Sequence, residues 1–338
     1  MTTAIDLSVC IPVYNCGEFL SDALDSILAQ CGPGVEVIVY DGGSTDMTPE
    51  VMRSHARPGL HYHRAATRGG IDADLASCVS LARGEYCWLF SGDDVMRPGA
   101  MAAAFEQISS GADVMVCRHT LCDLKMRGRR EYAVLLPVSE PLSVDMGDRL
   151  QRHAWFARAA TSEAFFSFLS GLIVRRSTWH RGHLEPAFVG SCWAHVVRLL
   201  ALVPDGLKVA YVPQIWLDQR GENDSFAAAG MVNRFRIAIE GFHAIGDALF
   251  GHDSAEAFHM RRVLRFEFKL EMFLVAKILC HDQPNRESRE LLDQLFAKLH
   301  CDSSIRQLPV LAGYWLTPVW LARALRGAAR RVRGRFNH

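Results

Sequence analysis

Two adjacent carboxylates, Asp93 and Asp94, end an apolar run in the stretch WLFSGDDVMRPGAM at residues 88–101. Neighbouring anions repel each other unless a positive charge lies beside them. Ser, Gly and Asp all favour turns, so a solvated turn is one interpretation of this stretch. The other interpretation is a strand that delivers carboxylates to a divalent cation at its C-terminal end.

Another carboxylate, Asp41, ends a second apolar run, VEVIVYD. Such short runs predict buried strands, and the amphipathic segments between them predict helices. Strand–helix alternation at this spacing indicates parallel β-α-β units in an α/β sheet covered by helices on both faces. Because ligands bind beyond the carboxyl ends of such strands, we expect Asp41 and the Asp93–Asp94 pair in one crevice, which favours the metal interpretation. The strands are expected at residues 7–13, 35–41, 60–64 and 85–90.

Later in the chain the apolar pattern changes to helical spacing. From about residue 226, segments such as VNRFRIAIEGFHAIGDALF and RRVLRFEFKLEMFLVAKILC place apolar residues on one helical face. The sequence therefore predicts an α/β domain over residues 1–225 and a helical region over residues 226–338.

The composition excludes several classes of protein. With 37 basic and 37 acidic residues the chain carries no net charge, which gives no support to a nucleic-acid partner. Its ten cysteines lack paired C-x-x-C spacing, so reduced core thiols in the cytoplasm are expected instead of a zinc site or disulfides. The first residues do not have the pattern of a leader peptide, so none is expected, and no apolar run approaches the roughly 20 residues of a spanning helix. We expect a soluble or peripheral protein.

Four motifs follow one another in the first 94 residues: IPVYN, VYDGGSTDMT, TRGGIDAD and ARGEYCWLFSGDD. No G-x-G-x-x-G or P-loop motif is present, which argues against dinucleotide binding and nucleotide hydrolysis. In this order the four motifs resemble the family 2 glycosyltransferases of the GT-A fold. The resemblance is strong over about 110 residues and weaker to about residue 225.

The resemblance implies roles for particular residues on the donor side. Arg68 would lie against the nucleotide base with Asp72 nearby, and Asp93 would also contact the donor. The Ser91–Asp94 turn would hold Mg²⁺ or Mn²⁺ on the donor diphosphate, and with Ser91 in place of the first usual carboxylate, Asp93 and Asp94 must carry the metal. The residues implied for the nucleoside pocket are Pro12, Tyr14 and Asp41.

On the acceptor side the stretch VGSCWAHVVRLL resembles the helix whose Asp is the general base of inverting family members. Cys192 occupies that position between Ser191 and Trp193, and an ordinary thiol is a poor base. Three accounts remain open. His195 is the base or a metal ligand; or Glu185 or Asp218 supplies a carboxylate; or the enzyme retains anomeric configuration and the leaving phosphate takes the proton. The variant GSCWAH also resembles a subgroup that includes O-antigen abequosyltransferases.

Two further segments complete the predicted site and its setting. WLDQRGENDSF at residues 216–226 resembles the loop that closes over the donor diphosphate, implying Arg220, Asn223 and Ser225 as ligands; a surface turn is the alternative. The C-terminal segment from Trp315 carries one apolar arc and one arginine face, with Trp315 and Trp320 beside it. This pattern suits an anionic membrane surface, although a helix packed on the domain with solvated arginines is also open.

The sequence thus predicts a metal-dependent glycosyltransferase in bacterial surface polysaccharide or O-antigen synthesis. Its donor would be a UDP-, CDP-, dTDP- or GDP-linked sugar. Its acceptor would be a saccharide, lipid-linked, at the cytoplasmic face of the membrane. The alternatives are a sugar nucleotidyltransferase and a non-catalytic sugar-nucleotide-binding or scaffold protein, the second suggested by Ser91 and Cys192.

Overall fold

The computed structural model describes residues 5–223, 229–302 and 304–335, with side chains in the last helix described to residue 328. The chain divides into two compact units, residues 1–223 and residues 224–338. The sequence placed this division at residue 225. Each unit is described below by itself.

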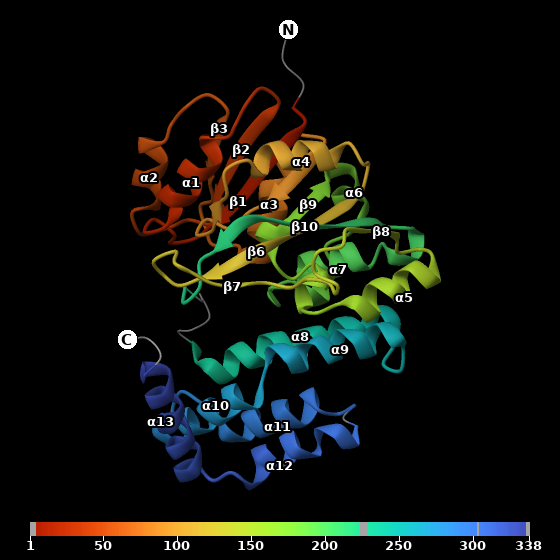
Figure 1. Cartoon of the computed structure of the whole chain (residues 1–338). Helices are drawn as coiled ribbons and strands as arrows, with labels where there is room; N and C mark the ends of the chain where they lie inside the picture. Colours follow the sequence, from red (N-terminus) through yellow and green to blue (C-terminus); the bar gives the residue numbers. More distant parts are fainter. Residues whose placement is uncertain (1–4, 224–228, 303, 336–338) are drawn as a thin grey trace. The chain divides into compact units, whose positions relative to one another are not determined.

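The first unit is built around one sheet of short strands (Figure 1). Its strands are β1 (Leu7–Val13), β2 (Val35–Asp41), β3 (Leu60–Arg64), β4 (Tyr86–Leu89), β5 (Val95–Met96), β6 (Val114–Cys122), β7 (Gly128–Glu131), β8 (Leu142–Asp145), β9 (Leu172–Arg175) and β10 (Lys208–Gln219). Its helices are α1 (Leu20–Leu28), α2 (Thr48–Ser54), α3 (Ile71–Ser80), α4 (Ala100–Ile108), α5 (Arg149–Arg158), α6 (Arg176–Arg181) and α7 (Ala194–Leu200). The four expected strands are confirmed, and the α/β class with them.

The sheet is mixed, with strand order β3-β2-β1-β4-β9-β6-β10-β5. Strands β3, β2, β1 and β4 pair in parallel, as predicted. Strand β9 runs antiparallel between β4 and β6, and β10 pairs in parallel with β6. Consequently β1, β2, β4, β6 and β10 all point the same way. Their carboxyl ends lie along one edge of the sheet, which is where a ligand of such a fold binds.

Helices cover both faces of the parallel half of the sheet. Side chains of α1, α2 and α4 join Val9 and Val37 in one hydrophobic cluster. On the other face Cys10 meets Cys78 of α3, together with Cys87 of β4. All ten cysteines are free, and these three are buried. The thiols therefore serve as small core side chains, as the sequence indicated.

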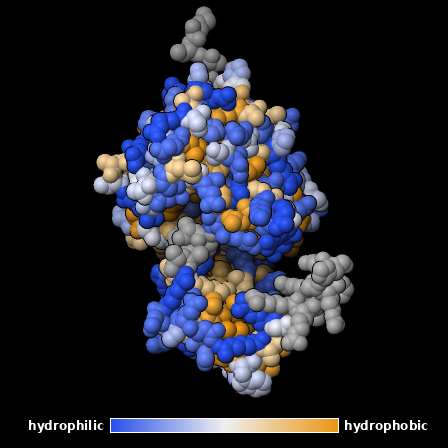
Figure 2. Space-filling model, turned by 90° about the vertical axis from the view of Figure 1, so that its left-hand side faces the viewer, coloured by the Kyte–Doolittle hydropathy of each residue, from blue (hydrophilic) through white to orange (hydrophobic). Residues whose placement is uncertain are grey.

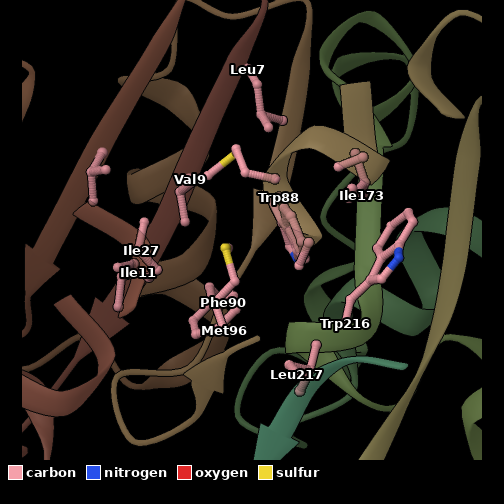
Figure 3. Packing of buried hydrophobic residues seen from close by; sticks show 14 of the residues in the cluster. Leu7, Val9, Ile11, Ile27, Trp88, Phe90, Met96, Ile173, Trp216 and Leu217 are labelled. Atoms are coloured by element: carbon pink, nitrogen blue, oxygen red, sulfur yellow. The ribbon is translucent and has the colours of Figure 1, made fainter. Parts of the chain in front are cut away.

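Aromatic packing fixes the ends of the central strands. Trp88 lies with its ring centroid 5.6 Å from that of Trp216, and Figure 3 shows both beside Phe90 and Met96 in the core. The indole nitrogen of Trp88 donates a hydrogen bond to the carbonyl of Ser170 at 2.8 Å. Because a buried indole N–H needs a partner, this bond aligns β4 with the segment that precedes β9.

The second unit is helical (Figure 1). Its helices are α8 (Met231–Phe250), α9 (Ala255–Glu267), α10 (Leu270–Asp282), α11 (Arg289–Leu299), α12 (Leu308–Leu316) and α13 (Val319–Arg335). Among the described residues, none of its helices, or of the first unit's, has the length and apolar content needed to cross a membrane.

Two short breaks interrupt segments of this unit that have helical spacing in the sequence. The chain leaves the helix at Phe268 and Lys269, where no Gly or Pro stands, because Phe268 and Phe273 both pack against Phe235, with ring centroids 5.2 and 4.9 Å from it. A second break at Thr317 separates α12 from α13. Tertiary packing, which helical periodicity does not report, decides the first of them.

Candidate functional site

The acidic turn predicted at the end of β4 is held from beneath by Asp94. This carboxylate is buried, and its two oxygens accept hydrogen bonds from the Ser170 hydroxyl at 2.5 Å and the Arg220 backbone N–H at 3.0 Å. The Ser170 oxygen in turn accepts from the backbone N–H of Ser91 at 2.9 Å. Asp94 therefore ties the turn to segments 76 and 126 residues further along the chain.

Asp93 is the half-exposed carboxylate of the turn. It accepts hydrogen bonds from the Ser91 hydroxyl and from the side-chain amide of Asn223, the latter at 2.8 Å. Burial, and next the negative charge of Asp93, raise the pKa of Asp94 well above its usual range. Two carboxylates so close, one of them desolvated, favour a nearby positive charge.

Arg220 is buried, and its guanidinium is directed into the protein. Its Nε donates to the carbonyl of Asp93 at 2.9 Å, Nη1 to the carbonyl of Leu124 at 2.7 Å, and Nη2 to the carboxylate of Asp22 at 2.7 Å. The same guanidinium lies over the Phe19 ring. These contacts leave at most one N–H on each terminal nitrogen for a phosphate, so the predicted role of Arg220 as a diphosphate ligand stays a prediction. The third predicted diphosphate ligand, Ser225, lies outside the described residues.

The turn fits a divalent cation in part. Mg²⁺ and Mn²⁺ take oxygen ligands, and Mg²⁺ in particular binds through one or two carboxylates completed by substrate phosphates. Asp93 and Asp94 match that donor set. Across the described residues no group of three His, Cys, Asp or Glu side chains could hold a metal, so the predicted set of Asp93, Asp94 and His195 is not assembled. His195 is thereby corrected as a metal ligand, since its Nε2 lies 3.1 Å from the carbonyl of Phe166.

Asp41 lies at the end of β2 with β1 as the one strand between it and β4, which puts the two strand ends about 10 Å apart. The Asp41 carboxylate is buried and accepts from the Ser44 backbone N–H at 2.7 Å and the Tyr62 hydroxyl at 2.6 Å. The Arg64 Nε lies 3.5 Å away. Asp41 is therefore a buried residue that fixes neighbouring groups of the crevice and is not exposed in it.

Tyr14 and Arg68 form the exposed rim of the same crevice. Tyr14 follows β1, and the guanidinium of Arg68 lies 4.0 Å from the centroid of its ring. A stacked Arg–Tyr pair offers a flat cationic platform of the kind that accepts a planar base. Pro12 lies buried within β1, opposite Tyr40 of β2. The structure thus brings Tyr14 and Arg68 together as the sequence implied, with Pro12 behind them.

Asp72 is placed differently from the prediction. It lies in the first turn of α3, and its carboxylate accepts backbone N–H groups of Gly190, Cys192 and Ala194. Asp72 is therefore directed at the acceptor-side segment and not at a nucleotide base.

The three candidate general bases occupy different environments. His195 is buried, and desolvation lowers its pKa to about 4, which makes it a weak base near neutral pH. Asp218 is engaged by Arg97, whose Nη2 lies 2.7 Å from its carboxylate. Glu185 is exposed and precedes a short 3-10 turn, Pro186–Phe188. The geometry thus favours none of the three over the others as the base.

Several contributors to the site were missed from the sequence. The Ser170 hydroxyl donates a hydrogen bond to Asp94, and the Tyr62 hydroxyl donates one to Asp41. Asp74 is buried against the glycine loops, because a Cβ added at Gly42 would lie 2.5 Å from its Oδ2 and one at Gly69 would lie 2.7 Å from its Oδ1. A signal was available for Asp74, since an acidic residue in the first turn of a helix after two glycines is visible in GGIDAD.

A separate hollow of about 320 Å³ lies at the amino ends of β2 and β3, beside Cys31, Arg57 and Gly59. It contains none of the residues of the acidic turn. Because it opens on the edge opposite to the strand carboxyl ends, it is not the site described above.

Comparisons with known sequences agree on the kind of chain that carries this site. Residues 8–160 match the model of glycosyl transferase family 2. The chain is 27% identical, over 88% of its own length and 91% of the relative's, to abequosyltransferase RfbV of Salmonella typhimurium. It is 29% identical to glycosyltransferase GlyG of Streptococcus pneumoniae, over 32% of this chain and 38% of that protein. These matches confirm the predicted resemblance to family 2 and to its abequosyltransferase-like subgroup.

Comparisons with solved structures agree on the fold. S. aureus TarS in complex with UDP-GlcNAc superposes with a TM-score of 0.58 at 16% identity, covering 97% of this chain and 92% of that one. Mannosyltransferase PcManGT from Pyrobaculum calidifontis, in complex with GDP-Man and Mn²⁺, gives a TM-score of 0.51 at 19% identity, covering 96% and 86%. The chain is therefore a glycosyltransferase of GT-A architecture, and its residues 8–160 are similar to glycosyl transferase family 2.

Proposed function

We propose that this glycosyltransferase takes a sugar from a nucleoside-diphosphate donor that binds at the carboxyl edge of the sheet. The observation that carries the proposal is the half-exposed Asp93 above a buried, fully hydrogen-bonded Asp94, on the edge that also carries the Tyr14–Arg68 platform. The base would lie on that platform. The diphosphate would then extend toward Asp93.

A divalent cation, Mn²⁺ or Mg²⁺, would be held by Asp93 and Asp94, and when bound it neutralises charge that develops on the departing diphosphate. The chain's own residues prepare this place. Ser170 and the Arg220 backbone N–H hold Asp94 in one orientation, and Asn223 does the same for Asp93. Preorganised carboxylates bind a cation without a further ordering cost. That a structural neighbour was solved with GDP-Man and Mn²⁺ supports the cation and the donor class.

The acceptor would be a saccharide, and we propose that it is lipid-linked in bacterial surface polysaccharide synthesis. Support comes from the relative named abequosyltransferase, which matches nearly the whole chain. Ser191, Cys192 and Trp193, which directly precede α7, would contact the acceptor. A nucleotidyltransferase or a non-catalytic scaffold is not favoured by these relatives.

Peripheral contact with an anionic membrane is proposed for the second unit. In α12 and α13 the side chains of Trp315, Leu316 and Trp320 are 50%, 79% and 70% exposed. Arg323 and Arg326 follow on α13, and the chain has no acidic residue after Asp302. Figure 2 shows hydrophobic residues gathered on the face of this unit that carries α13, with hydrophilic ones around them. Exposed tryptophans beside arginines suit the headgroup region of an anionic bilayer.

The donor proposal is tested by titrating the full chain with UDP-, CDP-, dTDP- and GDP-sugars, with and without Mn²⁺, while following the melting temperature. A ligand of the native state raises that temperature with occupancy. We expect one nucleotide class to stabilise the wild type in the presence of Mn²⁺, and Asp93→Asn to abolish the Mn²⁺-dependent part. Asp148→Asn, which alters an exposed helix cap far along the chain, is the matched control. Stabilisation of Asp93→Asn equal to wild type would contradict the site.

The membrane proposal is tested by sedimentation with vesicles of phosphatidylglycerol and of phosphatidylcholine. Wild type should sediment with the first and not with the second, because the arginines need an anionic surface. The double variant Trp315→Ala/Trp320→Ala should stay in the supernatant. The control replaces two other exposed aromatics of the same unit, Phe258 and Phe266, with alanine. Equal loss of binding in both double variants would remove the assignment to α12 and α13.

A further inference from the structure

The Asp72 carboxylate organises a segment that lies more than a hundred residues away. Its Oδ2 accepts from the backbone N–H of Gly190 at 2.8 Å and of Cys192 at 3.0 Å, and its Oδ1 accepts from that of Ala194 at 3.2 Å. The side chain is buried. Alternate residues of one short segment thus point their N–H groups at one anion.

The rest of the segment's backbone is satisfied as well. The Ser191 N–H donates to the carbonyl of Phe188 at 3.1 Å, and the Trp193 N–H donates to the Ser191 hydroxyl oxygen at 3.0 Å. Every backbone N–H from Gly190 to Ala194 therefore has a partner. Asp72 supplies three of these five partners.

This conformation is one that the chain would not adopt unaided. Cys192 has φ of 73°, a left-handed value that side chains with a Cβ rarely take, and Gly190 has φ of 87°. Strained backbone persists where surrounding contacts over-determine it. The Asp72 carboxylate accepts a hydrogen bond from both of these residues, so it helps to hold the strained conformation of Cys192 in place.

Asp72 also lies close in sequence to the donor side. Arg68, four residues earlier, lies over Tyr14, and Gly70 with φ of 83° turns the chain into α3. One five-residue segment therefore contacts both the platform proposed for the nucleoside and the segment proposed for the acceptor.

We propose that Asp72 is a positioning residue for acceptor transfer: it holds Ser191, Cys192 and Trp193 in the conformation that receives the acceptor, and it does not contact the donor nucleotide. The inference rests on the proposed acceptor side of the site. It replaces the donor role that sequence resemblance implied for Asp72.

The test compares the full-length wild type with Asp72→Asn. The asparagine amide has the same shape as the carboxylate, but a nitrogen replaces one of the two oxygens. This nitrogen donates, so it cannot accept from the backbone N–H groups that it faces. Loss of charge-assisted hydrogen bonds predicts a fall in kcat, or a rise in acceptor KM, of roughly tenfold or more. The donor Kd, measured by calorimetry with the nucleoside diphosphate and Mn²⁺, should stay within about twofold because the Tyr14–Arg68 platform is unaltered.

A second readout does not depend on activity. Cys192 is partly exposed, so its rate of alkylation, followed by mass spectrometry, reports how firmly the segment is held. Asp72→Asn should raise that rate several-fold and leave exposed Cys301 unchanged as the internal reference. If no donor turns over but alkylation responds, the proposed function fails and the positioning role stands.

The matched control is Glu287→Gln. Glu287 is also buried, and its carboxylate accepts two backbone N–H groups, those of Met231 at 2.6 Å and Val232 at 2.9 Å, at the start of α8. This control should match any loss of stability without changing acceptor kinetics or Cys192 alkylation. Unchanged Cys192 alkylation in Asp72→Asn overturns the proposal. A donor Kd that rises while acceptor KM stays constant also overturns it, in favour of a nucleotide contact.

Discussion

Replacing Arg220 separates two roles that sequence and geometry assign to it. If Arg220 binds the donor phosphate, Arg220→Lys should lower the affinity of the protein for the donor without lowering its stability. If Arg220 has a buried structural role, the same replacement should lower the stability of the first unit even when no nucleotide is present. The hydrogen bonds of the guanidinium to the carbonyls of Asp93 and Leu124 favour the structural role.

The magnitude follows from the partners. Hydrogen bonds that involve a charged group contribute about 1.5–3 kcal/mol each, so the two bonds to carbonyls contribute about 3–6 kcal/mol. The pair with Asp22 adds at most about 1 kcal/mol, because that carboxylate is 60% exposed to water. Arg220→Ala should therefore destabilise the first unit by about 3–6 kcal/mol. Arg220→Lys, which cannot reproduce the fork, should cost about half of that.

The assay is urea denaturation without nucleotide, followed by tryptophan fluorescence, to which buried Trp88 and Trp216 in the core between β4 and β10 contribute. The control is Arg53→Lys, an exposed arginine paired with Glu50, which should change stability by less than about 0.5 kcal/mol. If Arg220→Lys keeps wild-type stability and loses affinity for the nucleoside diphosphate, the structural role is refuted and Arg220 is a phosphate ligand.

Three further changes have defined outcomes. Ser170→Ala leaves the buried Asp94 carboxylate and the half-buried Ser91 N–H without their hydroxyl partner and should lower the urea stability of the first unit by about 2–4 kcal/mol. His195 has a folded-state pKa of about 4 against 6.5 for the free residue, so the unfolded chain binds more protons between these values and stability is lost as the pH falls through that window. The loss reaches about 3 kcal/mol of unfolding free energy. In urea titrations at successive pH values, His195→Gln should remove this dependence of stability on pH. Lys277→Met removes a buried ammonium that donates to two carbonyls at the end of α12, and faster hydrogen exchange of α12 should follow.

Each of these has an outcome that would contradict it. Unchanged urea midpoints for Ser170→Ala would mean that water replaces the hydroxyl and that the turn is more open than its burial indicates. A pH slope that survives His195→Gln would point to another buried histidine, such as His119, whose pKa is also lowered by desolvation, to about 3. Faster exchange throughout the second unit, and not in α12 alone, would make Lys277 a core residue rather than a local cap.

Local sequence predicted the parallel half of the sheet well. Continuous apolar runs such as LSVCIPV become strands buried on both faces, because a strand covered by helices on each side has no polar face to alternate with. The carboxyl ends of parallel strands share an edge, so the convergence of Asp41 with the Asp93–Asp94 turn could be predicted from strand order alone.

Side-chain direction was not predictable in the same way. Arg220 and Asp72 were given roles by resemblance, yet each side chain is directed at protein groups far along the chain. The positive φ of Cys192 likewise has no local signal, since nothing in GSCWAH distinguishes a left-handed residue from an extended one. Long-range hydrogen bonds determine all three.

The sequence by itself determined which elements form the parallel half of the sheet and that their acidic ends lie on one edge, because hydrophobic period and turn residues act over a few neighbours. Only the tertiary structure decided which carboxylate is open and which is buried. Asp93 and Asp94 are adjacent and chemically identical, and their difference comes from Ser170 and the Arg220 N–H, groups brought beneath the turn by the pairing of β9 and β10 within the sheet. Burial is a property of the folded chain, and no local pattern records it.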